Sequence, residues 1–319
     1  MSNVLHLEPT TRCTLFCPAC PRTTWHNILK KPVDKEDLDI DLLEKFLDCE
    51  TGKKFNEFRL CGAYGDPIYY PDLIKLIHRF RDRVSFTIVT NGSRQTEKFW
   101  NTLAESMTEK DIICFSIDGL EDTNHLYRIN SDWKSIMMGL DIMVKSPAQV
   151  HWKTIIFKFN YNKLSEIKKF ANAKGATWQT EKTHRYGDVS LVPPIEYVET
   201  NHVFQTEFVN NHQIEIEPRC EKDAMVVSAS GYLFPCDWIR NPQTFYKSQF
   251  WKQKTRWIDN LHMKDNTYDQ SILVVRDWEN YVRQNSLIGS DKVDVLCKML
   301  CRKGCASDTK NSGNFDIID

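Results

Sequence analysis

The chain has 319 residues, and its 42 lysines and arginines almost balance its 43 aspartates and glutamates. This length allows one large domain and a smaller one. The balanced charge gives no basic field to attract nucleic acid, so nucleic acid is disfavoured as a partner. The amino terminus lacks a basic segment followed by an apolar run, and no stretch is long and apolar enough to cross a bilayer. We therefore expect a soluble, cytoplasmic protein without a membrane partner.

Strands and helices are predicted to alternate over the first part of the chain. Apolar and β-branched runs predict strands at residues 4–8, 58–61, 84–90, 112–117, 150–159 and 176–180. Apolar residues in helical spacing predict helices between them, at residues 41–48, 71–80, 96–106, 133–144 and 164–174. Because such alternation implies parallel strands joined by right-handed crossovers, the expected fold class is α/β.

Three cysteines, Cys13, Cys17 and Cys20, lie in the loop that follows the first predicted strand. In parallel barrels the chemistry gathers at the carboxyl ends of the strands, which is where this loop lies. A cubane iron–sulfur cluster normally takes four thiolates, so three converging cysteines leave one iron for a ligand that is not protein. The alternatives are a disulfide and a structural zinc site, for which His6 or His26 would have to supply the fourth ligand at an uncommon spacing.

Eight of the eleven cysteines fall into two groups, one in this loop and one in the last hundred residues. In a cytosolic enzyme of this size grouped cysteines bind metal or do chemistry more often than they form disulfides. Cys49, Cys61 and Cys114 stand apart, and we expect them to be buried thiols that behave as small hydrophobic side chains.

Polar side chains follow the second, third and fourth predicted strands. The segment Gly62-Ala63-Tyr64-Gly65-Asp66-Pro67 comes after the second strand, and its glycines let the backbone approach a ligand while the acid accepts hydrogen bonds from an ammonium group. Asn91 ends the third strand, and Ser116 and Asp118 end the fourth. On local sequence alone each of these segments is also an ordinary strand-terminating turn.

Further along, Arg128 carries a guanidinium fork that matches a carboxylate, although an arginine before a helix is more often simply exposed. Lys153, Lys158 and Asn160 lie on or just after the fifth predicted strand. Polar groups that point inward there either face a substrate or cap the rim of the barrel.

The spacing of Cys13, Cys17 and Cys20 resembles the signature of the radical S-adenosylmethionine (SAM) enzymes, and about the first 180 residues are similar to that family. The resemblance implies a partial (β/α)6 TIM-like barrel, a 4Fe-4S cluster held by these cysteines, and SAM bound at the open iron. In the family an electron from the cluster cleaves SAM to methionine and a 5′-deoxyadenosyl radical, which abstracts a substrate hydrogen.

The same resemblance assigns the SAM contacts to the polar strand ends, with Asp66 in place of the glutamate of the family's Gly-Gly-Glu-Pro motif. The implied cofactor-binding residues are Gly62, Tyr64, Gly65, Asp66, Asn91, Ser116 and Asp118. We add Arg128 on its own chemistry, because its guanidinium fork matches the SAM carboxylate. The chain departs from the family pattern just before the third cysteine, where Ala19 replaces the usual aromatic residue.

The second half of the chain carries the other group of cysteines. Pro193-Pro194 interrupts helix and strand, and we expect a boundary here between domains at residues 1–190 and 191–319. Cys220 and Cys236 flank a predicted hairpin whose strands are residues 225–228 and 232–234. Three more cysteines near the carboxyl terminus bring the number of thiols to five, which is enough for a closed four-cysteine site: Cys297, Cys301 and Cys305.

Cys220, Gly231 and Cys236 resemble the opening of the SPASM or Twitch extension of radical SAM enzymes. This resemblance implies a smaller carboxyl-terminal Twitch-like iron–sulfur domain that holds a second, auxiliary 4Fe-4S cluster. Cys220 and Cys236 would be two ligands, and two of Cys297, Cys301 and Cys305 would complete the set. A zinc site is the alternative, because such thiolate sets suit both metals.

These features together predict a radical SAM oxidoreductase or modifying enzyme that acts on a peptide side chain or a small molecule. It would receive its electron from an external donor such as flavodoxin or ferredoxin. The alternative is a non-enzymatic iron–sulfur electron-transfer or metal-binding protein, which would give Asp66, Ser116 and Asp118 no role. The sequence identifies neither the substrate nor a catalytic hydrogen donor.

Overall fold

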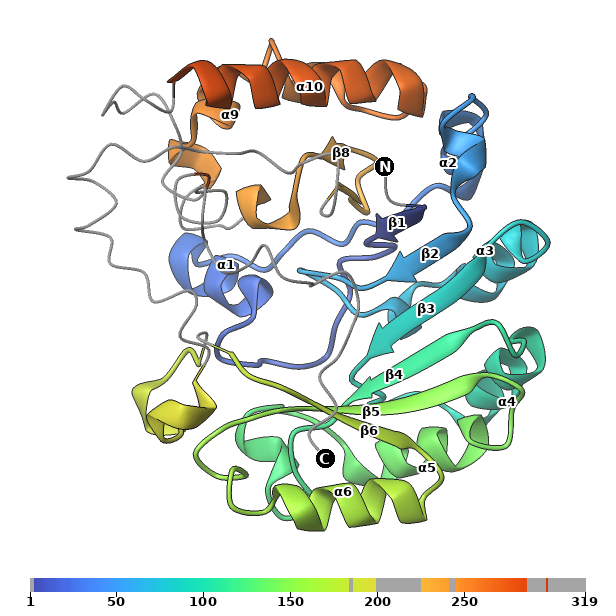
Figure 1. Ribbon diagram of the computed structural model, residues 1–319, viewed down its shortest axis with the longest axis vertical. Coiled ribbons are helices and arrows are strands. Elements are labelled where there is room, and N and C mark those ends of the chain that lie inside the picture. Colours follow the sequence, from blue (N-terminus) through green and yellow to red (C-terminus); the bar gives the residue numbers. More distant parts are fainter. Residues whose placement is uncertain (1–2, 184–185, 199–224, 241–244, 286–296, 298–319) are drawn as a thin grey trace. The chain divides into compact units, whose positions relative to one another are not determined.

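The computed structural model describes residues 3–183, 186–198, 225–240, 245–285 and 297 (Figure 1). The chain forms two compact units, and each is built from separate stretches of sequence. Among the described residues, those within 8–37 and 56–198 belong to the larger unit, and those within 3–7, 38–55 and 225–297 belong to the smaller unit.

The larger unit contains a parallel sheet whose strands follow one another in sequence order. Its strands are β2 (Glu57–Leu60), β3 (Ser85–Thr90), β4 (Ile112–Ser116), β5 (Gln149–Ile155) and β6 (Thr177–Glu181). Each strand pairs in parallel with the next. The predicted parallel α/β fold is therefore confirmed.

Helices connect these strands and cover one face of the sheet, as Figure 1 shows for α3 to α6. The helices of the larger unit are α1 (Pro21–Leu29), α3 (Leu73–Phe80), α4 (Glu97–Ser106), α5 (Trp133–Met143) and α6 (Leu164–Ala173). Short 3-10 turns occur at η2 (Pro67–Tyr69), η3 (Asn124–Leu126), η4 (Val189–Leu191) and η5 (Ile195–Tyr197).

Local chemistry explains where several of these helices begin and end. The Thr96 side chain accepts from the backbone N–H of Phe99 at the start of α4, and Asp132 accepts from that of Ser135 at the start of α5. Gly175 follows α6 with a φ of 87°, a left-handed conformation that glycine adopts at helix carboxyl ends without steric cost.

The core of the larger unit lies between the sheet and helices α3 to α6. Phe58, Phe86, Phe115 and Trp152 are among its largest fully buried side chains. Alternate residues of each strand point to opposite faces of the sheet, so the residues next to each of these aromatic residues along its strand project from the other face. That second face carries polar side chains such as Arg59 of β2, Lys153 of β5 and Glu181 of β6.

The smaller unit combines short strands with helices. Its elements are β1 (Val4–Leu7), α2 (Ile40–Phe46), β7 (Val226–Val227), β8 (Leu233–Phe234), α9 (Gln249–Lys252) and α10 (Tyr268–Asn285), with 3-10 turns η1 (Gly52–Lys54), η6 (Asp237–Arg240), η7 (Phe245–Lys247) and η8 (Ile258–Asn260). β1 pairs in parallel with β7, and β7 pairs antiparallel with β8. The predicted hairpin is thus confirmed. In the core of the smaller unit, the ring of Phe250 stacks on that of Trp257, and the ring of Trp278 packs edge to face against both.

Three elements differ from their predictions. Strand β5 ends at Ile155 instead of residue 159, because the Asn160 side chain accepts from the Phe157 N–H and turns the chain. Helix α1 was not expected, although Pro21 at its first position favours a helix start. Helix α10 was also not predicted. Within the described residues no helix has the length and apolar character needed to span a membrane.

Candidate functional site

The cysteine loop lies in the larger unit and ends at the start of helix α1. Cys20 is the N-cap residue of α1, and its N–H donates to the Cys17 carbonyl at 3.1 Å, which forms a tight turn between these two cysteines. Further backbone bonds hold the loop, from Asp66 N to Arg12 O at 2.9 Å and from Phe16 N to Ile129 O at 3.1 Å. The loop is therefore tied to the connections that follow β2 and β4.

The three thiols lie against a buried aromatic cluster. Leu15, Cys17, Tyr127, Phe157 and Tyr186 form this cluster, and Cys13, Ala19 and Cys20 pack against it. Ala19, the position where the chain departs from the family pattern, thus packs against a cluster that includes three aromatic rings from later connections.

Burial disfavours the thiolate forms of these cysteines. It raises the pKa of Cys13 to about 12, and the nearby Asp66 carboxylate adds to that rise. It also raises the pKa of Cys17 to about 11, whereas the charge and hydrogen bond of Arg128 lower it. Since metal ligands must be thiolates, a bound cation is what would stabilise the deprotonated form in this site.

The two metals considered for this loop demand different arrangements of their donors. A structural zinc ion would draw four ligands to within about 2.3 Å of one point. In the part of the chain that the structure describes, no three His, Cys, Asp or Glu side chains converge in a way that could hold a single ion. A four-iron cluster spreads its thiolates over separate irons and does not need its ligands to meet at one point.

The segment after β2 is a compact turn that requires its glycines. A Cβ atom on Gly65 would lie 1.9 Å from the Thr10 carbonyl oxygen, and one on Gly62 would lie 2.3 Å from the Gly65 oxygen. The N–H of Tyr64 donates to the fully buried Glu8 carboxylate. Glu8 was not predicted as a site residue, although an acid directly after a buried strand is a sequence signal that could have identified it.

Asp66 links this turn to the end of β3. Its buried carboxylate accepts from Thr90 Oγ1 at 2.8 Å, from the backbone N–H groups of Asn91 at 2.7 Å and Ile68 at 3.2 Å, and from the Asn91 side-chain amide. Burial raises the pKa of Asp66 to about 6, and the bonds from Asn91 and Thr90 oppose that rise. Asn91 Nδ2 in turn lies 3.7 Å from Cys13 Sγ, so this contact chain ends at the first cysteine.

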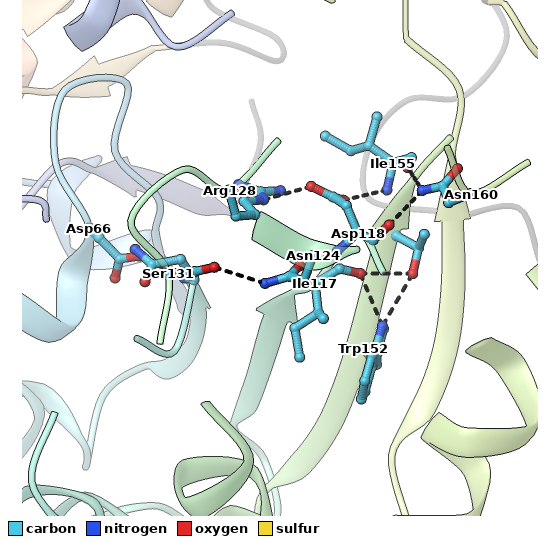
Figure 2. A network of polar contacts seen from close by, with 11 residues as sticks. Asp66, Ile117, Asp118, Asn124, Arg128, Ser131, Trp152, Ile155 and Asn160 are labelled. Atoms are coloured by element: carbon cyan, nitrogen blue, oxygen red, sulfur yellow. Dashed lines mark hydrogen bonds and ion pairs between the residues drawn. The ribbon is translucent and has the colours of Figure 1, made fainter. Parts of the chain in front are cut away.

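Asp118 forms a second polar network at the ends of β4 and β5 (Figure 2). Its fully buried carboxylate accepts from Arg128 Nε at 2.6 Å and from the Ile155 N–H at 2.8 Å. Asn160 Nδ2 donates to the Asp118 carbonyl at 2.6 Å, and the Asp118 N–H donates to Asn124 Oδ1 at 2.9 Å. Asn124 was not predicted as a site residue, because nothing in the local sequence indicates that it contacts Asp118, six residues earlier.

Arg128 joins this network to the second cysteine. Burial lowers the pKa of Arg128, but Asp118 and then Cys17 raise it more, so the net shift is upward and the guanidinium stays charged. The two contact chains, Asp66 with Asn91 and Asp118 with Arg128, therefore end at different cysteines of the loop. Ser116 ends β4 and lies opposite Lys153 of β5.

The other predicted positions give a mixed result. Of the cysteines expected to be buried, Cys114 is buried, Cys49 is partly buried and Cys61 is exposed. In the smaller unit, Cys236 and Cys297 are partly buried. Cys220, Cys301 and Cys305 lie outside the described residues, so the second cysteine set stays a prediction.

The fold and the loop define a class of protein, namely an α/β protein with a parallel sheet, a cysteine loop and buried polar groups at its strand ends. Solved structures share this fold: SuiB of Streptococcus suis bound to S-adenosylmethionine has a TM-score of 0.52 and 15% identity, over 81% of this chain and 68% of that one. Native anSMEcpe with AdoMet and a Cp18Cys peptide has a TM-score of 0.55 and 15% identity, over 84% and 79% of the two chains.

The family is shown by the sequence itself. The model described as the Radical SAM superfamily matches residues 7–172, just over half of the chain, and the protein belongs to this superfamily. Membership implies a 4Fe-4S cluster and SAM. A curated relative, the tungsten-containing aldehyde ferredoxin oxidoreductase cofactor-modifying protein of Pyrococcus furiosus, is 25% identical over 177 residues, which cover 52% of this chain and 47% of that protein. The chain thus spans about half the length of this relative.

Proposed function

We propose that the protein is a radical SAM enzyme that oxidises or otherwise modifies a peptide side chain or a small molecule. Cys13, Cys17 and Cys20 would hold the four-iron cluster. When bound, the cluster supplies one electron, received from a donor such as flavodoxin or ferredoxin, that cleaves SAM to methionine and the radical that abstracts a substrate hydrogen. The observation that carries this proposal is that buried polar networks from three strand ends meet the cysteine loop.

The proposed cofactor-binding residues divide by what their polar atoms already contact. The carboxylates of Asp66 and Asp118 are occupied by neighbouring N–H and O–H groups, so we assign them to positioning Asn91 and Arg128. Arg128 uses Nε for Asp118, and a bond to the SAM carboxylate would come from its terminal nitrogens. Gly62, Tyr64, Gly65 and Ser116 would supply the remaining backbone and hydroxyl contacts.

Asn91 and Arg128 would also tune the cluster. Hydrogen bonds and positive charge near the ligating sulfurs are among the factors that set the reduction potential of iron–sulfur clusters. Asn91 Nδ2 lies 3.7 Å from Cys13 Sγ, and Arg128 acts on Cys17 by charge and hydrogen bonding.

Two comparisons support the two substrate classes named in the proposal. Two solved neighbours are complexes with peptides, anSMEcpe with a Cp18Cys peptide and SuiB with the precursor peptide SuiA. The name of the curated relative describes modification of a cofactor. A peptide and a small molecule therefore both remain within the proposal, as does a second, auxiliary 4Fe-4S cluster held by Cys220, Cys236 and two of the three later cysteines.

Release of 5′-deoxyadenosine tests the proposal. The protein is reconstituted anaerobically with iron and sulfide, reduced with dithionite and incubated with SAM, and the nucleoside is measured by chromatography. We expect release by the wild type and its loss in Cys13→Ser, Cys17→Ser and Cys20→Ser, with Cys49→Ser as the control that retains it. A wild type with intact clusters that releases none would contradict the proposal and favour the electron-transfer alternative.

A further inference from the structure

Tyr69 links the cysteine loop to the turn that follows β3. Its hydroxyl oxygen lies 2.8 Å from Thr14 Oγ1, and its O–H donates to the Ser93 carbonyl. Tyr69 is the last residue of η2, and Thr14 directly follows Cys13 in the loop. One side chain therefore joins three segments that are far apart in the sequence.

The acceptors fix the direction of these two hydrogen bonds. A carbonyl oxygen only accepts, so the single Tyr69 hydroxyl proton goes to Ser93, and Thr14 donates to the Tyr69 oxygen. In such a chain each hydrogen bond polarises the next. Replacing Tyr69 by phenylalanine would remove both bonds, whereas replacing Thr14 by valine would remove only the first.

Ser93 carries the chain of contacts onward to Asn91. The N–H of the fully buried Ser93 donates to Asn91 Oδ1 at 2.9 Å. An amide nitrogen has two hydrogens, and Asn91 Nδ2 directs one of them to Asp66 and lies 3.7 Å from Cys13 Sγ. The contacts that begin at Thr14 thus return to the residue before it. We call this closed path the Cys13 circuit, which consists of Cys13, Thr14, Tyr69, Ser93 and Asn91.

Other bonds anchor the backbone of the loop independently of Tyr69. Asn130 Nδ2 donates to the Thr14 carbonyl at 2.7 Å, and the Phe16 N–H donates to the Ile129 carbonyl at 3.1 Å. Both bonds come from the connection that follows β4, whereas Tyr69 belongs to η2. Loss of the Tyr69 hydroxyl should therefore break the Cys13 circuit without releasing the loop.

We propose that Tyr69 is a positioning residue that holds Asn91 Nδ2 against Cys13 Sγ and thereby raises the reduction potential of the cluster in the loop. This inference rests on the proposed function and deepens it, because it names a residue that acts on the cluster through Asn91. A hydrogen-bond donor near a ligating sulfur stabilises the reduced cluster, which carries one more negative charge, so the donor shifts the reduction equilibrium toward that form.

The test measures the reduction potential of the loop cluster in the anaerobically reconstituted full-length protein without SAM. A redox titration is followed by electron paramagnetic resonance, and the four-iron signal that is lost in Cys13→Ala identifies the loop cluster. We expect Tyr69→Phe to lower the equilibrium constant of reduction about tenfold, the ratio that one hydrogen bond provides and a downward shift of about 59 mV for one electron. A potential equal to that of the wild type would overturn the inference.

Variants of Thr14 separate positioning from a general loss of structure. Thr14→Val should lower the potential by less than Tyr69→Phe, because Tyr69 stays bonded to Ser93, and Thr14→Ser, which keeps the hydroxyl, should restore the wild-type value. The double variant Thr14→Val, Tyr69→Phe should show the shift of Tyr69→Phe alone, since both side chains act along one path. Additive shifts would overturn the inference.

A second tyrosine of the larger unit provides the control. Tyr161 is partly buried like Tyr69, and its ring packs against that of Tyr197. Tyr161→Phe should keep the wild-type potential, and a shift equal to that of Tyr69→Phe would contradict the assignment to the Cys13 circuit. Because the potentials are measured without SAM, release of 5′-deoxyadenosine by the wild type tests the proposed function separately.

Discussion

Asp66 shows how a residue assigned to a ligand can serve the protein itself. The sequence placed an acid at a strand end, where an ammonium group could use it. In the structure the Asp66 carboxylate instead accepts hydrogen bonds from Thr90, Asn91 and Ile68. Local sequence gives no sign of these partners, because Thr90 and Asn91 lie more than 20 residues further along the chain.

We predict that Asp66→Ala lowers the free energy of unfolding by about 3 kcal/mol, since several buried donors lose their acceptor at once. Urea unfolding of the metal-loaded protein measures it. Asp82→Ala, which removes an exposed acid, is the control and should change stability by less than about 0.5 kcal/mol. Equal effects of the two substitutions would show that the Asp66 contacts contribute nothing to stability.

The ends of β4 and β5 are joined by side chains as well as by the strand ladder. Beyond the Asp118 contacts, the Ile117 carbonyl accepts from Trp152 Nε1 at 3.0 Å and from Thr154 Oγ1 at 2.9 Å (Figure 2). The alternation of strands and helices could be predicted, since it depends on local periodicity. The end of β5 could not, because Asn160 sets it through its own side chain.

Removing Arg128 tests how far this junction depends on its buried ion pair. We predict that Arg128→Met costs about 3–5 kcal/mol, because the fully buried Asp118 carboxylate is left without its cation. Thermal and urea unfolding measure the loss. Lys54→Met breaks the exposed pair with Glu50 and should cost at most about 1 kcal/mol. A loss for Arg128→Met no greater than for this control would contradict the prediction.

At the scale of the whole molecule, both compact units draw on more than one stretch of sequence. The loop of Cys13, Cys17 and Cys20 could be predicted, because its residues are close in sequence. Which of the later cysteines converge depends on long-range folding, and three of the five lie outside the described residues. The boundary between residues 190 and 191 likewise stays a prediction.

Metal content tests the auxiliary centre. Two four-iron clusters predict about eight iron atoms per chain after anaerobic reconstitution, and Cys220→Ser with Cys236→Ser should reduce this to about four. Cys114→Ala, a buried cysteine of the larger unit, should leave the iron content of the wild type. About four irons together with one zinc in the wild type would contradict the iron–sulfur assignment and support the zinc alternative.

The central claim is that three cysteines leave one iron of a cluster open to SAM. Low-temperature electron paramagnetic resonance of the anaerobically reduced protein, carrying the Cys220→Ser and Cys236→Ser substitutions to remove the auxiliary signal, tests it directly. We predict a reduced four-iron signal whose g values change when SAM is added. A signal that SAM leaves unchanged would contradict the claim.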